Sequence, residues 1–290
     1  MKIGMIGLGA MGHFVAENIL KAGYELVVYD VRPEACADLI ERGAQGADSL
    51  EDMGRLADNV FMMVNNYAQC RSVLEGLMQT MTGGTVINMS TVAMNDAEAL
   101  GKYAAEHGVT MLDSPVSGGT AGARDGSLTL MVAGSDEDFD KLRPVMESFA
   151  GNVVHVGKQV GQGQAVKTIN QLLVGVHMCA TAEAFTLARK CGLDLQMMYD
   201  VIRTSAGCSR IFENRGQFAI DRDFSTRSTL QIQLKDTDIV CRTADAVGAP
   251  AILANTAREL FKLSVKKYPP TDDSLEVMRL YEEMGAMEEN

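Results

Sequence analysis

A lysine and an asparagine in the middle of the chain have the spacing of a proton-transfer pair on a helix. Lys167 and Asn170 lie three positions apart in GQGQAVKTINQ (161–171), so on a helix they share one face. Val166, Leu173 and Val174 lie on or close to that face, and we therefore expect Lys167 to be partly desolvated. Desolvation lowers the pKa of a lysine from about 10.4 toward the range useful for proton transfer. A surface lysine whose alkyl stem lies along an apolar face fits the same pattern.

A glycine loop after a strand-like run has the composition of an anion site. Residues 113–119 are DSPVSGG, in which Ser117, Gly118 and Gly119 could present successive N–H groups and a hydroxyl to a carboxylate. A glycine loop that binds no ligand fits these residues equally well. The segment alone therefore indicates a candidate site for an anion, without naming the anion.

The N-terminal residues contain a glycine turn typical of dinucleotide binding. GLGAMG (7–12) follows a strand-like run and precedes a helical one, which is the context that this pattern requires. Gly7 permits the tight turn, Gly9 lets the backbone approach a pyrophosphate, and Gly12 lets the helix pack closely on the strand. The phosphates would lie at the helix N-terminus, where N–H groups and the helix dipole favour anions. We assign the whole turn to the cofactor: Gly7, Leu8, Gly9, Ala10, Met11 and Gly12.

An acidic residue and an arginine bear on the choice of dinucleotide. Asp30 ends the second strand-like run, 18 positions after Gly12, where a carboxylate can accept hydrogen bonds from the adenosine ribose. The same carboxylate would repel a 2'-phosphate. Arg32 would favour that phosphate if its guanidinium faces the ribose, and it is otherwise a solvent-facing loop residue. The sequence thus favours NAD as the cofactor and leaves NADP open.

The elements that must position these residues change character near residue 160. Up to that point short β-branched runs alternate with helical segments, which predicts a mostly parallel sheet covered on both faces. A single helical pattern then covers 163–193. Further helical segments are expected at 195–205, 235–247 and 250–266. We predict an α/β fold, with a Rossmann-type doubly wound domain over 1–162 and an all-α domain over 163–290, joined by the long helix.

Composition limits the classes of protein that fit the chain. The 290 residues carry a formal net charge of −12, whereas nucleic-acid-binding proteins usually present a basic face. The six cysteines have no C-x-x-C spacing, and no Cys/His cluster has zinc-ligand spacing, so we expect free thiols and no metal. No apolar stretch approaches the roughly 18 residues of a membrane span. We expect a cytoplasmic protein with a small-molecule substrate and no nucleic-acid or membrane partner.

Together these motifs resemble those of the β-hydroxyacid dehydrogenases, the family that includes 3-hydroxyisobutyrate dehydrogenase and tartronate semialdehyde reductase. The matching segments are GLGAMG (7–12), DSPVSGGTAGARDGSLTLMVAG (113–134), GQGQAVKTINQ (161–171) and LKDTDIV (234–240). They span nearly the whole chain in family order. The resemblance implies an oxidoreductase that transfers a hydride between NAD(P) and a short-chain hydroxy acid.

The resemblance also implies a role for each motif. Lys167 matches the catalytic lysine, which takes the hydroxyl proton during oxidation, and Asn170 matches the asparagine that orients the substrate. Residues 117–119 match the loop that holds the substrate carboxylate. Thr91 matches a residue beside the nicotinamide, and Lys235 matches the lysine that reaches the cofactor from the helical domain.

Two segments depart from the usual family pattern. Many members carry Leu-Pro where this chain has Val64, Asn65 and Asn66. Many carry K-x-x-N-N, whereas the last of these positions is Gln171 here. We place Val64 and Asn65 on the nicotinamide side of the site and Gln171 on the substrate side. The substrates of well-known members therefore do not carry over directly.

The helical half is most similar to the family members that act on L-threonate. The matching stretches, with one from the first half, are VNNYAQ (64–69), NQLLVGVHMCATAEA (170–184) and SAGCSRIFENR (205–215). They would place Phe212, Glu213, Asn214 and Arg215 at the border of the pocket, where polar groups suit a polyhydroxylated acid. An ordinary helix surface fits these four residues as well.

Alternatives to an L-threonate-like substrate remain open from the sequence. Within the family they are 3-hydroxyisobutyrate, tartronate semialdehyde or a related β-hydroxy acid. A decarboxylating 6-phosphogluconate-type enzyme would need a larger helical domain than 290 residues allow. An imine reductase, or a non-catalytic nicotinamide-binding or chromatin-associated protein, would usually lack Lys167. The resemblance implies a homodimer or homotetramer.

Overall fold

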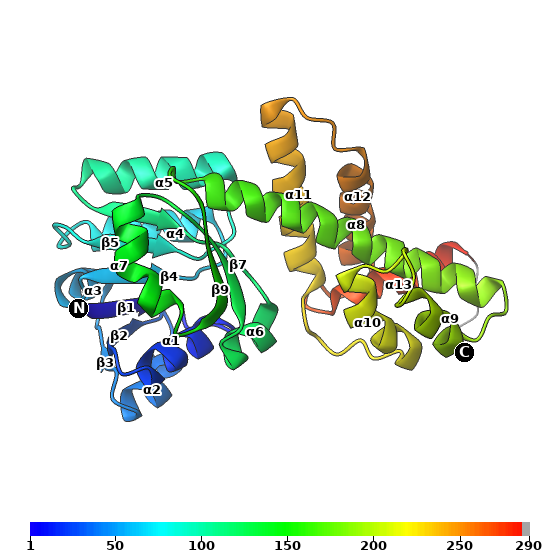
Figure 1. Ribbon diagram of the computed structural model, residues 1–290, viewed down its shortest axis with the longest axis horizontal. Coiled ribbons are helices and arrows are strands. Elements are labelled where there is room, and N and C mark those ends of the chain that lie inside the picture. Colours follow the sequence, from blue (N-terminus) through cyan, green and yellow to red (C-terminus); the bar gives the residue numbers. More distant parts are fainter. Residues whose placement is uncertain (286–290) are drawn as a thin grey trace. The chain divides into compact units, whose positions relative to one another are not determined.

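The computed structural model describes residues 1–285 and divides the chain into two compact units (Figure 1). Unit 1 is Met1–Lys167 and unit 2 is Thr168–Asn290, whereas the boundary expected from the sequence follows residue 162. Helix α8 (Gln162–Lys190) begins in unit 1 and continues in unit 2. It is the long helix that the sequence predicts at 163–193.

Nine strands in the described residues form one sheet, in the order β3-β2-β1-β4-β5-β6-β8-β7 with β9 paired to β8. They are β1 (Lys2–Ile6), β2 (Glu25–Tyr29), β3 (Gln45–Gly46), β4 (Asn59–Met62), β5 (Thr85–Asn88), β6 (Thr110–Asp113), β7 (Val116–Ser117), β8 (Leu128–Ala133) and β9 (Ala150–Gly157). The first six are parallel, and the order 3-2-1-4-5-6 is that of the Rossmann fold. The predicted fold of the first half is confirmed.

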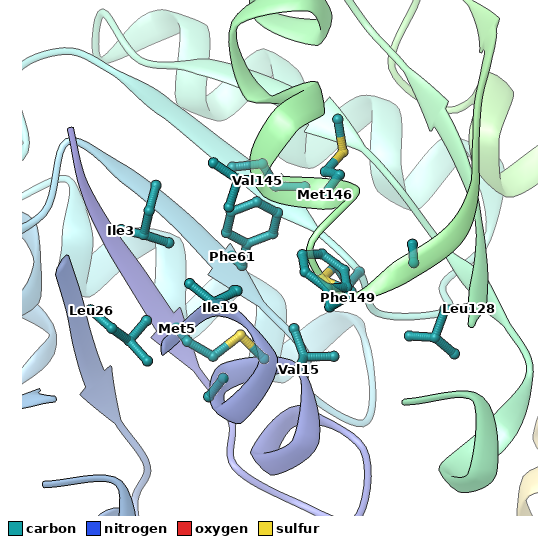
Figure 2. Packing of buried hydrophobic residues seen from close by; sticks show 14 of the residues in the cluster. Ile3, Met5, Val15, Ile19, Leu26, Phe61, Leu128, Val145, Met146 and Phe149 are labelled. Carbon is teal, nitrogen blue, oxygen red and sulfur yellow. The ribbon is translucent and has the colours of Figure 1, made fainter. Parts of the chain in front are cut away.

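Apolar layers cover both faces of the sheet, because successive side chains of a strand point to opposite faces. On one face Met5 of β1 packs in a cluster with Ile19 and Phe149 (Figure 2), and on the other Ile6 packs in a cluster with Leu74. The first layer is formed with α1 (Gly12–Lys21), η1 (Pro33–Cys36), α2 (Ala37–Glu41), α6 (Gly119–Asp125) and α7 (Asp136–Met146). The second is formed with α3 (Leu50–Leu56), α4 (Tyr67–Leu77) and α5 (Met94–Glu106).

The strand-like run VTMLDSPV (109–116) forms two strands instead of one. β6 ends at Asp113 and β7 begins at Val116. Pro115 lies between them and has no N–H to donate to a strand ladder. β7 then pairs antiparallel with β8, which departs from the parallel order of the first six strands.

Unit 2 is helical, as the sequence predicts for the second half. Beyond α8 its helices are α9 (Leu195–Ile202), α10 (Arg210–Asp221), α11 (Leu230–Val247), α12 (Ile252–Lys267), η2 (Ser274–Glu276) and α13 (Val277–Met284). α11 begins before the expected residue 235, because the Thr229 hydroxyl caps it by accepting a hydrogen bond from the Ile232 N–H at 3.2 Å.

Helix α8 contradicts the expectation that no segment is apolar enough to span a membrane. An 18-residue window of α8 has a mean hydropathy of 1.2, which passes the test of length and composition. Half of that window is buried within the structure. Met178, Ala182 and Phe185 of α8 belong to the core of unit 2, so this part of the helix packs in a globular core. Ile169, Leu173 and Leu187 of the same helix are exposed.

Candidate functional site

Four parallel strands of unit 1 end in one row. The register pairs Ile6 with Met62, Met62 with Asn88, and Asn88 with Asp113. The strand order reverses direction between β1 and β4, and ligands of such sheets bind at the carboxyl ends of the strands beside this reversal. The segments that follow the four residues are those to which the sequence assigns the cofactor and the substrate carboxylate.

The turn after β1 has room for a ligand at one glycine and none at the two that flank it. A Cβ on Gly7, where φ is +88°, would clash with the Met63 carbonyl oxygen, and a Cβ on Gly12 would clash with the Gly7 carbonyl oxygen. A Cβ on Gly9 would meet no described atom within 4 Å. The fold therefore requires Gly7 and Gly12, whereas a side chain at Gly9 would occupy only the space in front of the turn.

The amino end of α1 completes the cradle. Among the described residues no side chain caps this helix at Met11, and its first turn contains no acidic residue. Gly9 and Ala10, just before it, are exposed. An uncapped helix N-terminus offers N–H groups and a positive dipole end to phosphate. The turn therefore fits the pyrophosphate of a dinucleotide.

Asp30, which follows β2, holds both the glycine turn and Arg32. One carboxylate oxygen accepts a hydrogen bond from the Leu8 N–H at 2.7 Å. The other accepts bonds from the Arg32 N–H at 2.9 Å and the Arg32 Nε at 3.2 Å. Burial acts to raise the pKa of Asp30, but the bonds from Arg32 and Leu8 and the guanidinium charge together hold it below its ordinary value. Asp30 is thus anionic at neutral pH, and its side chain is 7% exposed.

The segment after β4 is held by side chains from two directions. The Ser90 hydroxyl accepts a hydrogen bond from the Val64 N–H at 2.9 Å. Asn66 caps α4 by accepting a bond from the Gln69 N–H at 3.0 Å, and the Gln69 side chain accepts one from the Asn65 N–H at 2.9 Å. The residues that replace Leu-Pro in this chain thus begin a helix and leave Asn65 exposed.

A buried carboxylate anchors the first turn of α8. Asp113 is 0% exposed and accepts hydrogen bonds from the Gly161 N–H at 3.2 Å, the Gln164 N–H at 2.8 Å and Gln164 Nε2 at 2.8 Å. Burial raises the pKa of Asp113 to about 6 in spite of these bonds. A Cβ on Gly163 would lie 2.8 Å from the Asp113 carbonyl oxygen, so the glycine permits the close approach. Lys167 follows one turn later and is only 7% exposed.

The loop after β6, to which the sequence assigns the substrate carboxylate, has two glycines in the left-handed region of backbone conformation. Gly118 and Gly119 have φ values of +130° and +62°, which glycine adopts far more readily than other residues. Both are exposed, and Ser117 beside them is half-buried. Gly118 is also the N-cap of α6. The exposed glycines of this loop therefore lie five and six residues after the carboxylate that anchors α8.

In unit 2 the Asp236 carboxylate contacts both Gln171, which the sequence places near the substrate, and Lys235, which it places near the cofactor. Asn170 Nδ2 donates to Gln171 Oε1 at 2.8 Å, and Gln171 Nε2 donates to an Asp236 oxygen at 2.5 Å. Lys235 Nζ lies 3.4 Å from the other Asp236 oxygen. Because a carboxylate can only accept, Asp236 sets the orientation of the Gln171 amide, and Gln171 that of Asn170. Sequence reasoning did not single out Asp236.

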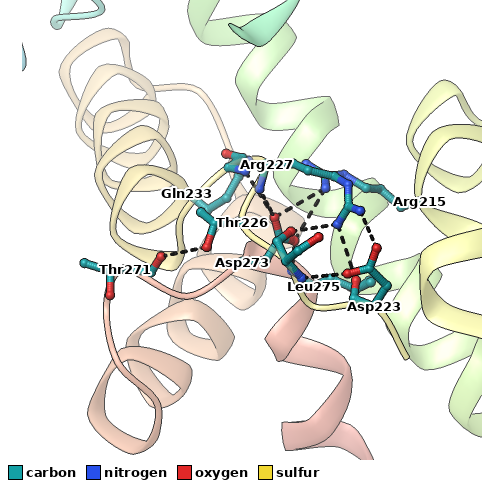
Figure 3. Close-up of polar contacts among 10 residues, drawn as sticks. Arg215, Asp223, Thr226, Arg227, Gln233, Thr271, Asp273 and Leu275 are labelled. Carbon is teal, nitrogen blue, oxygen red and sulfur yellow. Dashed lines mark hydrogen bonds and ion pairs between the residues drawn. The ribbon is translucent and has the colours of Figure 1, made fainter. Parts of the chain in front are cut away.

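The four residues 212–215 lie in different surroundings on α10. Phe212 is 4% exposed and packs in the core of unit 2. Arg215 lies 3.4 Å from the fully buried Asp273, on which donors from several segments converge (Figure 3). Glu213 and Asn214 are exposed. Phe212 and Arg215 are therefore engaged within unit 2, and only Glu213 and Asn214 present their side chains to the surface.

Two family models match the chain. The one described as the NAD binding domain of 6-phosphogluconate dehydrogenase matches residues 2–157. The one described as NAD-binding of NADP-dependent 3-hydroxyisobutyrate dehydrogenase matches residues 161–281. Together they account for most of both units.

Three similar proteins are hydroxyacid dehydrogenases by name. The chain is 40% identical over 278 residues to an L-threonate dehydrogenase of Escherichia coli O6:H1, a match that covers 94% of this chain and 92% of that protein. A crystal structure of a 3-hydroxyisobutyrate dehydrogenase from Salmonella typhimurium matches with a TM-score of 0.87 at 37% identity, covering 97% of this chain and 99% of the other. The 3-hydroxyisobutyrate dehydrogenase of Mycobacterium tuberculosis, solved with L-serine, matches with a TM-score of 0.90 at 28% identity, covering 97% and 98%.

Proposed function

The chain belongs to the 3-hydroxyisobutyrate dehydrogenase-related family of hydroxyacid dehydrogenases, and we propose that it oxidises L-threonate or a closely related short polyhydroxy acid with NAD. As a family member it is an oxidoreductase that binds a nicotinamide dinucleotide and acts on a hydroxyacid. The choice of substrate is supported by the 40% identity to an L-threonate dehydrogenase. The second candidate is 3-hydroxyisobutyrate, supported by the 37% identity to a dehydrogenase of that name.

The burial of Lys167 is the observation that carries the proposed chemistry. This lysine is 7% exposed and lies one turn after the Asp113-anchored start of α8. A general base must be held within reach of the proton that it takes, and a rigid helix turn provides that. A surface lysine, the other interpretation of the sequence pattern, would be far more exposed.

In the proposed oxidation each motif has one task. The substrate carboxylate binds the N–H groups and hydroxyl of Ser117, Gly118 and Gly119. Lys167 accepts the proton of the hydroxyl group that is oxidised, and returns it in the reverse direction. Asn170, oriented through Gln171, donates a hydrogen bond from its amide to the same hydroxyl oxygen. The bound nicotinamide dinucleotide supplies the hydride acceptor.

We assign the cofactor to the glycine turn, with Asp30 at the adenosine ribose, and favour NAD over NADP. A 2'-phosphate would bring further negative charge to the carboxylate of Asp30, which the surrounding hydrogen bonds keep anionic. Arg32 offsets part of that charge from 3.2 Å, so NADP should bind more weakly without being excluded. The nicotinamide side is assigned to Val64, Asn65, Thr91 and Lys235.

We further infer a homodimer or homotetramer in the cytoplasm. The resemblance to the family supports the oligomer, and the exposed free thiol of Cys191 suits a reducing compartment. Light scattering of the purified protein measures the assembly directly.

The test of the proposed function is nicotinamide reduction by purified protein supplied with L-threonate and either NAD or NADP. We expect reduction with NAD and slower reduction with NADP. Lys167→Ala should lose about 10² to 10⁴-fold of the turnover, the usual share of general acid–base catalysis. Its affinity for the dinucleotide should stay unchanged, because the glycine turn lies between β1 and α1.

Lys190→Ala is the matched control, since Lys190 is exposed in the last turn of the same helix. It should turn over like the wild type. Near-normal turnover by Lys167→Ala would refute the assigned role of that lysine. Reduction with 3-hydroxyisobutyrate but not with L-threonate would select the second candidate.

A further inference from the structure

The side chain of Gln164 is fully buried in the first turn of α8 and makes three hydrogen bonds to two separate segments. Its Nε2 donates to the Ser90 carbonyl at 2.9 Å and to an Asp113 carboxylate oxygen at 2.8 Å. Its Oε1 accepts a hydrogen bond from the Val92 N–H at 3.1 Å. Nothing in the proposed reaction so far uses this amide.

Each contact of Gln164 holds a segment that carries part of the proposed site. Ser90 and Val92 flank Thr91, which is assigned to the nicotinamide side. The Ser90 hydroxyl in turn accepts a bond from the Val64 N–H at 2.9 Å. Asp113 leads into the loop assigned to the substrate carboxylate. A continuous line of hydrogen bonds thus crosses the ends of β4, β5 and β6 and reaches α8.

The orientation of the Gln164 amide is determined by its partners. The Ser90 carbonyl and the Asp113 carboxylate can only accept, and the Val92 N–H can only donate. Turning the amide over would therefore break all three bonds. A shorter side chain would not reach, and a carboxylate at this position would face that of Asp113.

We propose that Gln164 is a positioning residue for the hydroxyacid oxidation. It sets the helix turn that carries Lys167 in register with the Ser90–Val92 segment and with Asp113, so that base, nicotinamide side and carboxylate loop are aligned together. This inference rests on the proposed function. Gln164 acts through the backbone of α8 and makes no contact with substrate.

Gln164→Met tests the proposal, because methionine keeps the length of the side chain and removes its three hydrogen bonds. Misplacing a reacting group by about 1 Å can cost about 10²-fold in rate. We expect kcat to fall by about that factor, with KM for the hydroxyacid within about fivefold of wild type and dinucleotide affinity unchanged. Gln164→Asn, which keeps the amide and loses reach, should behave in the same way, and it decides the matter if Gln164→Met does not fold.

Two control variants separate a loss of positioning from a general loss of folding stability. Gln162→Met changes an exposed glutamine in the same turn and should leave kcat unchanged. Leu142→Ala truncates a fully buried residue of α7 and should lower stability with little loss of kcat. The inference is overturned if both Gln164 variants keep kcat within threefold of wild type, or if Leu142→Ala loses as much.

Hydrogen exchange gives a readout that does not depend on the substrate. Exchange of the Val92 N–H should become faster in Gln164→Met, while the Ser114 N–H, bonded to the Asn88 carbonyl at 2.8 Å, should exchange as in wild type. A wild-type protein with no turnover of any hydroxyacid would refute the proposed function alone. Unchanged exchange at Val92 would overturn the role of Gln164 in either case.

Discussion

Alanine substitutions at two glycines of the turn after β1 should fail in different ways. A Cβ on Gly12 would lie less than 3.0 Å from the Gly7 carbonyl oxygen, a separation that real Cβ atoms essentially never show. It would also lie 3.1 Å from the methyl carbon of Met5. Relieving that overlap requires α1 to move away from β1, and overpacking of this kind costs about 1–3 kcal/mol of the free energy of unfolding. Because the obstacle is backbone, Gly12→Ala should fall at the upper end of that range.

Gly9→Ala should leave stability unchanged and weaken the dinucleotide. Its methyl group would meet no described atom within 4 Å, so the free energy of unfolding should change by less than about 0.5 kcal/mol. The methyl would fill the space through which a pyrophosphate approaches the backbone. Affinity should therefore fall at least about tenfold, which corresponds to about 1.4 kcal/mol.

Urea unfolding and a fluorescence titration with the reduced dinucleotide measure the two quantities separately. Gly83→Ala is the matched control, because a Cβ there also meets no described atom within 4 Å, and Gly83 lies outside the proposed site. It should match wild type in both assays. Dinucleotide binding of wild-type strength by Gly9→Ala would refute the cradle, and wild-type stability of Gly12→Ala would refute the steric argument.

Two further predictions concern buried carboxylates. Asp273→Ala should lower the free energy of unfolding by about 3–5 kcal/mol in urea, because Arg215 and the N–H groups of Arg227 and Leu275 lose their buried acceptor. The exposed Asp245→Ala should change it by less than about 0.5 kcal/mol, and equal losses would contradict the argument. For Asp113, the folded pKa of about 6 lies above the unfolded value of about 4, so the folded protein binds the extra proton. The free energy of unfolding of wild type, measured relative to that of Asp113→Asn, should therefore fall as the pH rises from about 4 to about 6, and should level off above that. A difference that stays constant over this pH range would show that Asp113 does not titrate there.

The glycine turn, the parallel sheet and the helical second half could be predicted because their signals are local. GLGAMG between a strand and a helix needs only neighbouring residues to be recognised. Alternation of strands with helices likewise indicates a Rossmann sheet. The exact bounds of the elements were less well predicted. Pro115 divides the run 109–116 into two strands, and α11 begins at Leu230, directly after its cap Thr229, rather than at residue 235.

The polar contacts that organise the candidate site could not be predicted from sequence patterns. Gln164 and Asp236 both lie inside segments that carried the family resemblance, yet nothing in a single sequence marks them as buried. The same holds for Phe212, which packs in the core of unit 2.

Local patterns in the chain were thus enough to predict the glycine turn and the alternation of strands and helices, whereas the family resemblance singled out Lys167 as the candidate base. Which polar groups face one another was decided only in the folded protein. Gln164 lies 51 positions from Asp113 and 74 from Ser90, and it meets both because parallel strands end in one row beside the start of α8. A hydrogen bond depends on such proximity, whereas helical or strand periodicity reports only the nearest neighbours along the chain.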